Sequence, residues 1–323
     1  MTDVNRVPDA EITLPGLTLI GAPSDAGAAS LGAAMGPDAL RVAQIGPALQ
    51  RLGLDVRDLG NLAGPPNPRG VAVDGVRHLD ECVAWNRAVQ DAVAGVLAEG
   101  RLPVMMGGDH QLAAGSISAV AQHCRVHGRR LRVLWLDAHA DCNTPAMSTT
   151  GNVHGMPVAA LCGLGPPALS GLSDRTPALP PGNLCQIGLR SVDAEEKHVI
   201  RDLGIEVYDM RAIDELGMRE VMRRALHGIA SPQVHLHVSF DADFLDPSIA
   251  PGTGTPVRGG VNYREAQLCM EMIADTGRLA SLDLVEINPA LDVRNQTAEV
   301  VVELVQSLFG QSTLVRTPLR ARR

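Results

Sequence analysis

The chain has few aromatic side chains: three Phe, two Tyr and two Trp in 323 residues. Its hydrophobic interior must therefore consist mainly of Ala, Val, Leu and Ile. No apolar run reaches the roughly 18 residues that a membrane-spanning helix needs, and several prolines break the long uncharged stretch 142–173. The first residues, MTDVNRVPDAE, lack the cationic-then-apolar pattern of a signal peptide. We therefore expect a cytoplasmic protein with no membrane partner.

Lysine and paired cysteines are also scarce. Lys197 is the only lysine, and 28 basic against 36 acidic residues give a net charge of −8. This balance argues against general nucleic-acid binding, which needs a basic face. The six cysteines are scattered without a C-x-x-C pair, which is typical of ordinary thiols in a reducing cytoplasm.

Short apolar runs alternate with longer helix-like segments. The expected strands are 17–21, 103–106, 132–137, 184–188, 206–209, 235–241 and 282–286. The expected helices are 78–97, 113–126, 194–203, 214–228, 263–274 and 297–308. Such alternation predicts an α/β protein with three α/β/α layers and a mainly parallel central sheet. Since no linker separates two halves, we expect one domain over 1–323, with its core at about 17–310.

Acidic and imidazole side chains gather where the expected strands end. One strand runs into DAHAD (137–141), another into DAD (241–243), and GGDH (107–110) follows a third. If the extended backbone continues, side chains two residues apart point to one side, and ligands of parallel sheets bind at this edge. Buried carboxylates crowded together need cations to neutralise them. The candidate metal ligands are His110, Asp137, His139, Asp141, Asp241 and Asp243.

The alternative for a lone D-x-D is a turn or a helix cap. The full set of six candidate ligands is more specific for metal binding, because four carboxylates balance the charge of two divalent cations and leave a neutral centre. Such a centre can hold a shared hydroxide, since both cations lower the pKa of the water. Carboxylate and imidazole ligands disfavour calcium and suit manganese, with iron, cobalt or zinc as alternatives. The lack of a thiolate ligand argues against structural zinc.

Several motifs together resemble the ureohydrolases, and specifically the arginases. They are GGDH (107–110), DAHADCNTP (137–145), TGNVHGMP (150–157), SFDADFLDP (239–247) and GTGTPVRGGVNYRE (252–265). The resemblance extends from about Leu17 to about Gly310. It implies one α/β/α domain, two Mn²⁺ per subunit, a homotrimer or homohexamer, and hydrolysis of L-arginine to L-ornithine and urea. A hydroxide that bridges the metals would attack the guanidinium carbon.

The resemblance also implies roles for individual residues. His110, Asp137, Asp141 and Asp241 would hold one manganese, and Asp137, His139, Asp241 and Asp243 the other. The implied catalytic residues are His154 for proton transfer, Glu286 facing the guanidinium, and the ligand Asp141. These roles agree with the chemistry, because a carboxylate can orient a planar guanidinium and a histidine can relay a proton near neutral pH. Without the resemblance, His154 could cap a turn and Glu286 could form an edge salt bridge.

The uncharged loop 142–157 offers neutral donors for an α-carboxylate. The resemblance implies that Thr255 lines the guanidinium pocket. It also implies that the substrate's head group is bound by Asn143, Ser148, Thr150, Asn152, Asp193 and Glu196. Agmatine has no carboxylate, so this loop favours arginine as the substrate. The alternative is that the loop is a flexible surface turn without a ligand contact. Ser191 stands where many arginases carry aspartate. Ser148 and Thr150 exchange serine and threonine relative to common arginases. Relatives acting on agmatine, guanidinobutyrate or another guanidino compound therefore remain the alternative.

Two other classes of protein deserve comparison. A metallophosphoesterase also begins its site with D-x-H, but its downstream G-N-H-D/E element is missing. A non-catalytic arginine-binding or scaffold protein has no support, because the ligands, His154 and Glu286 are all present. The basic tail 314–323 could be a subunit contact or a frayed end.

Overall fold

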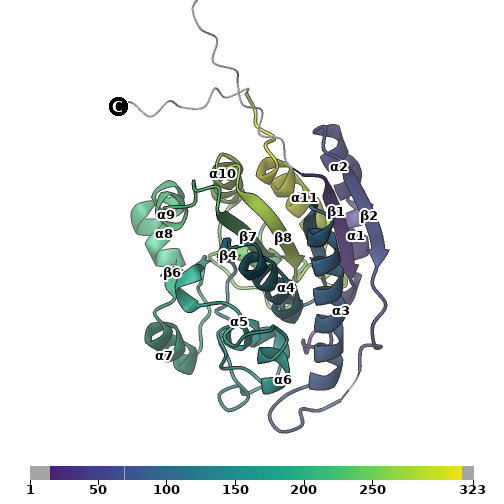
Figure 1. Ribbon diagram of the computed structural model, residues 1–323. Helices are drawn as coiled ribbons and strands as arrows, with labels where there is room; N and C mark the ends of the chain where they lie inside the picture. The colour runs from purple at the N-terminus through teal and green to yellow at the C-terminus, as the bar shows by residue number, and fades with distance from the viewer. Residues whose placement is uncertain (1–14, 69, 315–323) are drawn as a thin grey trace, which may run out of the picture.

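The computed structural model describes residues 15–68 and 70–314, so most of the basic tail lies outside the described residues. Eight parallel strands form one sheet in the order β2-β1-β3-β8-β7-β4-β5-β6 (Figure 1). The strands are β1 (Leu17–Ala22), β2 (Val56–Asn61), β3 (Leu102–Gly107), β4 (Arg130–Leu136), β5 (Leu184–Ile187), β6 (Glu206–Tyr208), β7 (Val234–Asp241) and β8 (Leu279–Val285).

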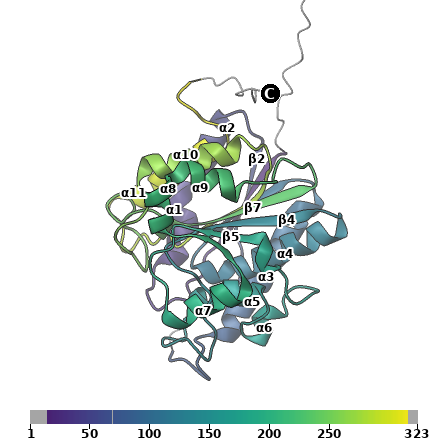
Figure 2. The ribbon, with the colours of Figure 1, turned by 90° about the vertical axis from the view of Figure 1, so that its left-hand side faces the viewer.

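Helices cover both faces of the sheet (Figure 2). One face packs against α1 (Gly36–Val42), α2 (Ile45–Arg51), α8 (Met210–Leu216), α9 (Met218–Ala225), α10 (Tyr263–Ala274) and α11 (Gln296–Leu308). The other packs against α3 (Leu79–Ala98), α4 (Ala113–Val126), α5 (Pro157–Leu161) and α7 (Ala194–Leu203), with α6 (Pro167–Ser170) beyond α5. Within the described ranges, no helix combines the length and apolarity needed to cross a bilayer.

Strand β4 shows why the sequence folds into three layers. Leu134 and Leu136 contribute to the core on one face, whereas Val133 and Trp135 contribute to the core on the other. Successive strand side chains point to opposite faces, so a strand that is apolar from Val133 to Leu136 needs helices on both sides. The predicted α/β/α architecture with a parallel sheet is confirmed.

Three expectations about individual elements were wrong or incomplete. The helix expected at 214–228 is two helices, α8 and α9, because Gly217 has φ 77° between them. Strand β2 was missed because it is an edge strand whose residues are half-buried or exposed, so it has no apolar signature. The short helices α1, α2, α5 and α6 were missed as well.

The face of β7 that lies toward α4 is polar although it is buried. His235 Nε2 and His237 Nδ1 lie 2.9 and 2.8 Å from Ser281 Oγ on β8. His237 Nε2 lies 3.1 Å from Asp283 Oδ2, and Ser116 of α4 donates to Asp283 Oδ1 at 2.6 Å. We refer to these five residues as the buried polar strip. It connects the N-terminal part of β7 to helix α4.

Helices α3 and α4 lie unusually close to each other. A Cβ placed on Gly115 would lie 2.2 Å from the carbonyl oxygen of Asn86, so only glycine fits there. The Gly115 N–H also donates to Asn86 Oδ1 at 2.6 Å.

Candidate metal centre

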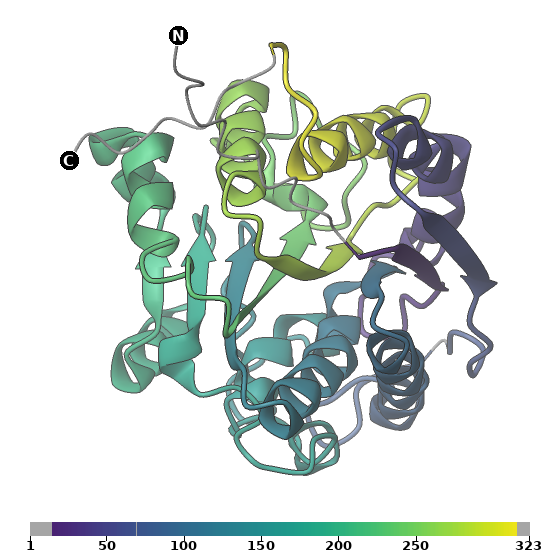
Figure 3. The same cartoon turned by 45° about the horizontal axis from the view of Figure 1, so that its top comes forward.

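The candidate ligands lie at the carboxyl edge of the sheet, as the motifs predicted. Asp241 ends β7, Asp137 directly follows β4, and His110 begins a 3₁₀ turn, η2 (His110–Leu112), just after β3. Glu286 directly follows β8. These four strands are neighbours in the sheet, and Figure 3 shows them side by side between the helix layers. Side chains distant in sequence therefore meet in one place.

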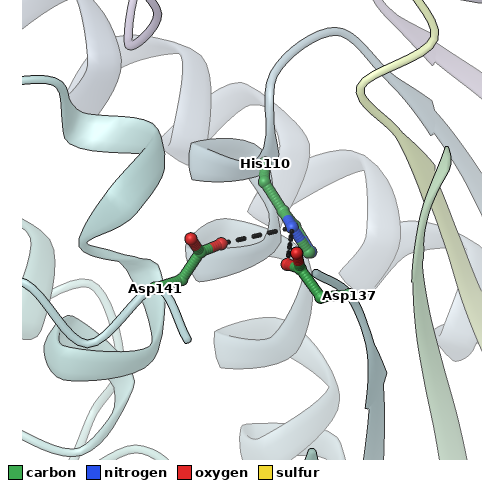
Figure 4. Close-up of side chains that lie close together, drawn as sticks. All are labelled: His110, Asp137 and Asp141. Carbon is green, nitrogen blue, oxygen red and sulfur yellow. Dashed lines mark ion pairs between the residues drawn. The ribbon is translucent and has the colours of Figure 1, made fainter. Parts of the chain in front are cut away.

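His110 is surrounded by carboxylates. Its Nδ1 lies 3.0 Å from Asp137 Oδ2, 3.3 Å from Asp141 Oδ2 and 3.1 Å from Asp241 Oδ2. Figure 4 shows Asp137 and Asp141 pointing at this nitrogen. The other ring nitrogen, Nε2, lies 2.8 Å from Ser239 Oγ. A hydrogen bond at Nε2 leaves Nδ1 to face the carboxylates, which is the orientation a metal-ligating histidine needs.

A second group of ligand atoms forms beside the first. His139 Nδ1 lies 3.1 Å from Asp243 Oδ2 and 3.6 Å from Asp137 Oδ1. Ligand atoms of His110, Asp137 and Asp141 all lie within 4.8 Å of one another, and the same holds for Asp137, His139 and Asp243. Asp137 belongs to both groups and can therefore bridge two ions.

Burial and crowding perturb the ionisation of this cluster. Burial raises the pKa of Asp141 and Asp241 well above the ordinary range, and neighbouring carboxylates raise both further. Burial disfavours the cationic form of His110 and His139, yet the surrounding carboxylates raise their pKa to about 9 and about 12. The chain thus gathers more negative charge than it can bury alone, and protons or cations must compensate for it.

The residues fit a pair of divalent cations. His110 Nδ1 and Asp141 Oδ2 are buried and have no hydrogen-bond partner among the described residues. Both atoms point toward the space that the carboxylates share. The donors are carboxylate oxygens and imidazole nitrogens without sulfur, which suits manganese-type ions rather than structural zinc.

The backbone reaches this arrangement differently from the expectation of continued extended chain. Asp141 has φ 51°, in the left-handed region that side chains rarely occupy. Asp243 lies in a 3₁₀ turn, η5 (Ala242–Phe244), whose N-terminus is capped by the Asp241 side chain. The predicted convergence is observed, but tight turns rather than strand alternation produce it. Such strained positions cluster at functional sites.

Glu286, which is buried, and His154, which is partly buried, form a pair next to His110. Glu286 Oε1 accepts the His110 backbone N–H at 2.9 Å and lies 3.0 Å from His154 Nδ1. Burial opposes both charges, yet each group favours the ion of the other: the pKa of Glu286 is lowered and that of His154 is raised. Glu286 Oε2 is buried without a partner in the described chain, so it is available to a ligand.

Asp109 is a supporting residue that the sequence analysis did not single out. Its carboxylate accepts the backbone N–H of Gly27 at 2.7 Å, and Gly27 O in turn accepts the His154 N–H at 3.2 Å. Burial raises the pKa of Asp109 to about 8, with Glu286 as the next cause. The sequence feature that could have identified Asp109 is its position in GGDH, directly before the candidate metal ligand His110. For Ser239, the signal was its two-residue spacing from Asp241 on β7.

A cavity of about 110 Å³ opens onto the cluster. Its lining residues are His110, His139, Asp141, Asn143, His154, Gly155, Ser191, Asp193, Glu196, Asp241, Thr255 and Glu286. Four of the predicted substrate contacts are therefore brought together, namely Asn143, Asp193, Glu196 and Thr255. Thr255 donates to Asp243 at 3.1 Å, and Asn143 donates to Asp193 at 3.2 Å.

The other predicted substrate contacts do not line this cavity. Ser148 Oγ accepts the Gly151 N–H at 2.9 Å, and Thr150 Oγ1 accepts the Asn152 N–H at 3.2 Å. These contacts shape the loop itself.

Glu196 has a structural task in addition to lining the cavity. Its two oxygens accept the N–H groups of Asp193 and Cys142, both at 2.9 Å. It thereby joins the start of α7 to the loop that follows the DAHAD segment.

Comparison with known proteins agrees with this geometry. The sequence profile described as "Arginase family" matches residues 16–310. The chain belongs to the arginase family. It is 44% identical over 300 residues to an arginase of Brucella melitensis, covering 92% of this chain and 97% of that protein. The solved arginase structure of Bacillus caldovelox has a TM-score of 0.86 and 41% identity, covering 93% of this chain and 100% of the other.

A second solved arginase, from Bacillus subtilis, has a TM-score of 0.85 and 39% identity, with 93% and 100% coverage. The matched range 16–310 spans the positions of every candidate metal ligand, His154 and Glu286. The resemblance to the arginases over about 17–310 is therefore confirmed, and the relatives are matched over nearly their whole length.

Proposed function

We propose that this chain hydrolyses L-arginine to L-ornithine and urea with two manganese ions. The observation that carries the proposal is the convergence of six candidate metal ligands, four of which line the same cavity as Glu286, whose Oε2 has no partner among the described residues. Membership of the arginase family and relatives named arginase support the same reaction.

Each group of ligand atoms supplies three ligands, and the resemblance to the arginases adds Asp241 to both sets. His110, Asp137, Asp141 and Asp241 would hold one ion, and Asp137, His139, Asp241 and Asp243 the other. Two divalent ions supply, when bound, the charge that lowers the pKa of water and yields a nucleophile near neutral pH. Ser239 holds His110 in the ligating orientation, and Thr255 orients Asp243.

Glu286 has the geometry to bind the guanidinium. Its Oε1 is occupied by His110 and His154, whereas Oε2 has no partner in the described part of the chain. A buried carboxylate oxygen accepts strong charge-assisted hydrogen bonds from a guanidinium. Glu286 therefore orients the planar group in the cavity with its carbon toward the ligand cluster.

His154 is placed to supply the proton that the leaving amine needs. Because its Nδ1 faces Glu286, Nε2 is the ring nitrogen left to pass a proton. The neighbouring carboxylate raises the pKa of His154 and so keeps a proton on the ring.

Asn143 and Asp193 at the same cavity support recognition of an α-amino acid head group. Asp193 offers a carboxylate to the α-ammonium group, while the loop that follows Asp141 offers amide and hydroxyl donors to the α-carboxylate. We propose that Ser148, Thr150 and Asn152 act on the carboxylate from this loop, and Glu196 on the ammonium side. Ser191 lines the cavity without adding a charge, which weakens this recognition but does not remove it.

The test is a substrate panel on manganese-loaded protein, with metal content measured on the same sample. Urea should be released from L-arginine faster than from agmatine or guanidinobutyrate. Turnover of agmatine without turnover of arginine would contradict the substrate but not the chemistry. His139→Ala should lose bound metal and activity together, whereas full activity without metal would contradict the mechanism.

We also propose a single domain that assembles as a homotrimer or homohexamer in the cytoplasm. Six buried, unpaired cysteines fit a reducing compartment. Leu31, Met35, Leu291 and Val293 are exposed large apolar side chains. They lie on two segments, 31–35 and 291–293, and the hydrogen bond from Asn288 to Leu31 O joins these parts of the chain. Exposed apolar groups of this kind mark interaction surfaces. Light scattering after size exclusion should give the mass of three or six chains; a monomer would contradict the assembly.

A further inference from the structure

A second cavity lies at the opposite edge of the sheet from the metal centre. It measures about 220 Å³ and lies between the C-terminal end of α4, the start of β4 and the loop that precedes β5. Its apolar lining includes Ala121, Cys124, Leu131 and Ala178, all buried. The polar lining is dominated by arginine. We refer to Arg125, Arg129, Arg130 and Arg175 as the arginine cluster.

The arginine cluster carries an excess of positive charge. Arg125 forms an ion pair with Asp174 and donates to Ser173 Oγ at 2.7 Å and Ala178 O at 3.2 Å. Arg130 donates to the Gly228 carbonyl at 2.9 Å, a contact that leaves its charge uncompensated. Asp174 is the one carboxylate paired with the cluster in the described residues.

Arg129 and Arg175 are the two guanidinium groups free to bind a ligand. Their side chains form no hydrogen bond or ion pair within residues 15–68 and 70–314. The electrostatic effect reaches the neighbouring helix end: the pKa of His123 is lowered by burial, by His127 and by Arg129. Both residues are exposed, so their guanidinium groups are open to a dissolved ligand.

Compensation of the helix dipole does not account for this cluster. Cations stabilise the last turn of a helix, and Arg125 lies in the last turn of α4. Arg129 and Arg130 come after the helix, and Arg175 arrives from a loop about fifty residues away in sequence. Only one of the four positions is therefore explained by the helix.

We propose that the arginine cluster binds a small, multiply charged oxyanion, of the class that includes phosphate and phosphate monoesters. The planar guanidinium donates paired hydrogen bonds to such oxygens, and Arg125 is already fixed in place by its protein contacts. The cavity is smaller than the roughly 300–1,000 Å³ of drug-sized ligand sites, so it suits a compact group. One isolated cluster lacks the extended basic face that nucleic acid requires.

The probe is inorganic phosphate, titrated by calorimetry into the manganese-loaded full chain at constant ionic strength. The test variant is Arg129→Ser/Arg175→Ser. The matched control is Arg201→Ser/Arg211→Ser, which removes two exposed arginines elsewhere and changes the net charge equally. Circular dichroism and metal content of both variants should match those of the parent chain.

We expect saturable binding at one site that weakens at least tenfold in the test variant and less than twofold in the control. No saturable heat in the parent chain would overturn the proposal. Unchanged binding in the test variant would place the phosphate elsewhere, for example at the metal centre, and would also overturn it. Equal weakening in both variants would show general electrostatic attraction without a site, a third outcome that refutes it.

Discussion

The substitution Glu286→Gln separates guanidinium binding from folding and metal binding. The change keeps the shape of the side chain. An amide oxygen at the Oε1 position can still accept from the His110 N–H, and His154 can still donate to it. The amide nitrogen then replaces Oε2, the buried atom that has no partner in the described structure. A donor would therefore face the N–H groups of the guanidinium.

The expected loss follows from the hydrogen bond that disappears. A hydrogen bond to a charged group contributes about 1.5–3 kcal/mol. Since about 1.4 kcal/mol corresponds to a factor of ten, kcat/KM for L-arginine should fall about tenfold to a hundredfold. The lost charge acts on bound substrate, so manganese content should be unchanged.

The assay is urea release under kcat/KM conditions, with metal content and thermal unfolding measured on the same preparations. Glu299→Gln, an exposed position at the start of α11, is the matched control and should behave like the parent chain. A Glu286→Gln variant with kcat/KM within twofold of the parent would refute the role of Glu286. Loss of manganese would show instead that Glu286 supports the ligand cluster.

Three further predictions concern stability and reactivity. Gly115→Ala should lower the free energy of unfolding in urea by about 1–3 kcal/mol, because overlap with the Asn86 carbonyl outweighs the roughly 1 kcal/mol gain in helix propensity; a stabilised variant would contradict the close packing. Burial opposes the ionisation of Asp246, but hydrogen bonds from Ser248 and from the N–H groups of Gly259 and Gly260 lower its pKa to about 2. Its contribution is present above the unfolded pKa near 4 and is lost as pH falls toward 2, so Asp246→Asn should destabilise at pH 6 and progressively less at pH 3. All six cysteines are buried with raised pKa, so Ellman's reagent should label none until the chain unfolds, and rapid labelling of the folded chain would contradict their burial.

The fold was predictable where burial leaves a pattern. Strands such as β1 and β3 are buried along their whole length and appear as mainly apolar runs, so their positions and the parallel sheet were predicted. The edge strand β2 has one open side and a polar sequence, so no such run marks it. Gly217 divides α8 from α9 through a backbone conformation that helical periodicity does not encode.

The candidate site was predictable as a set of residues but not as a geometry. Metal-ligand spacing at strand ends identified His110, Asp137 and Asp241, which the structure brings together. Asp141 has a left-handed backbone, which the spacing of the motif does not predict. The support of His154 by Asp109 through Gly27 joins segments about eighty residues apart, and a motif read along the chain cannot show such a link.

The buried polar strip affects how precisely His110 is positioned at the candidate metal centre. Helix α4 contributes Ser116 to this strip, and this residue donates a hydrogen bond to Asp283 of β8. Sliding the helix by one turn would separate these partners inside the protein, and each unsatisfied group costs about 1–3 kcal/mol. The helix therefore has one longitudinal position on the sheet. His110 lies in the turn that leads into the same helix, so its placement at the carboxyl edge of the sheet is fixed in part by hydrogen bonds made deeper along the sheet.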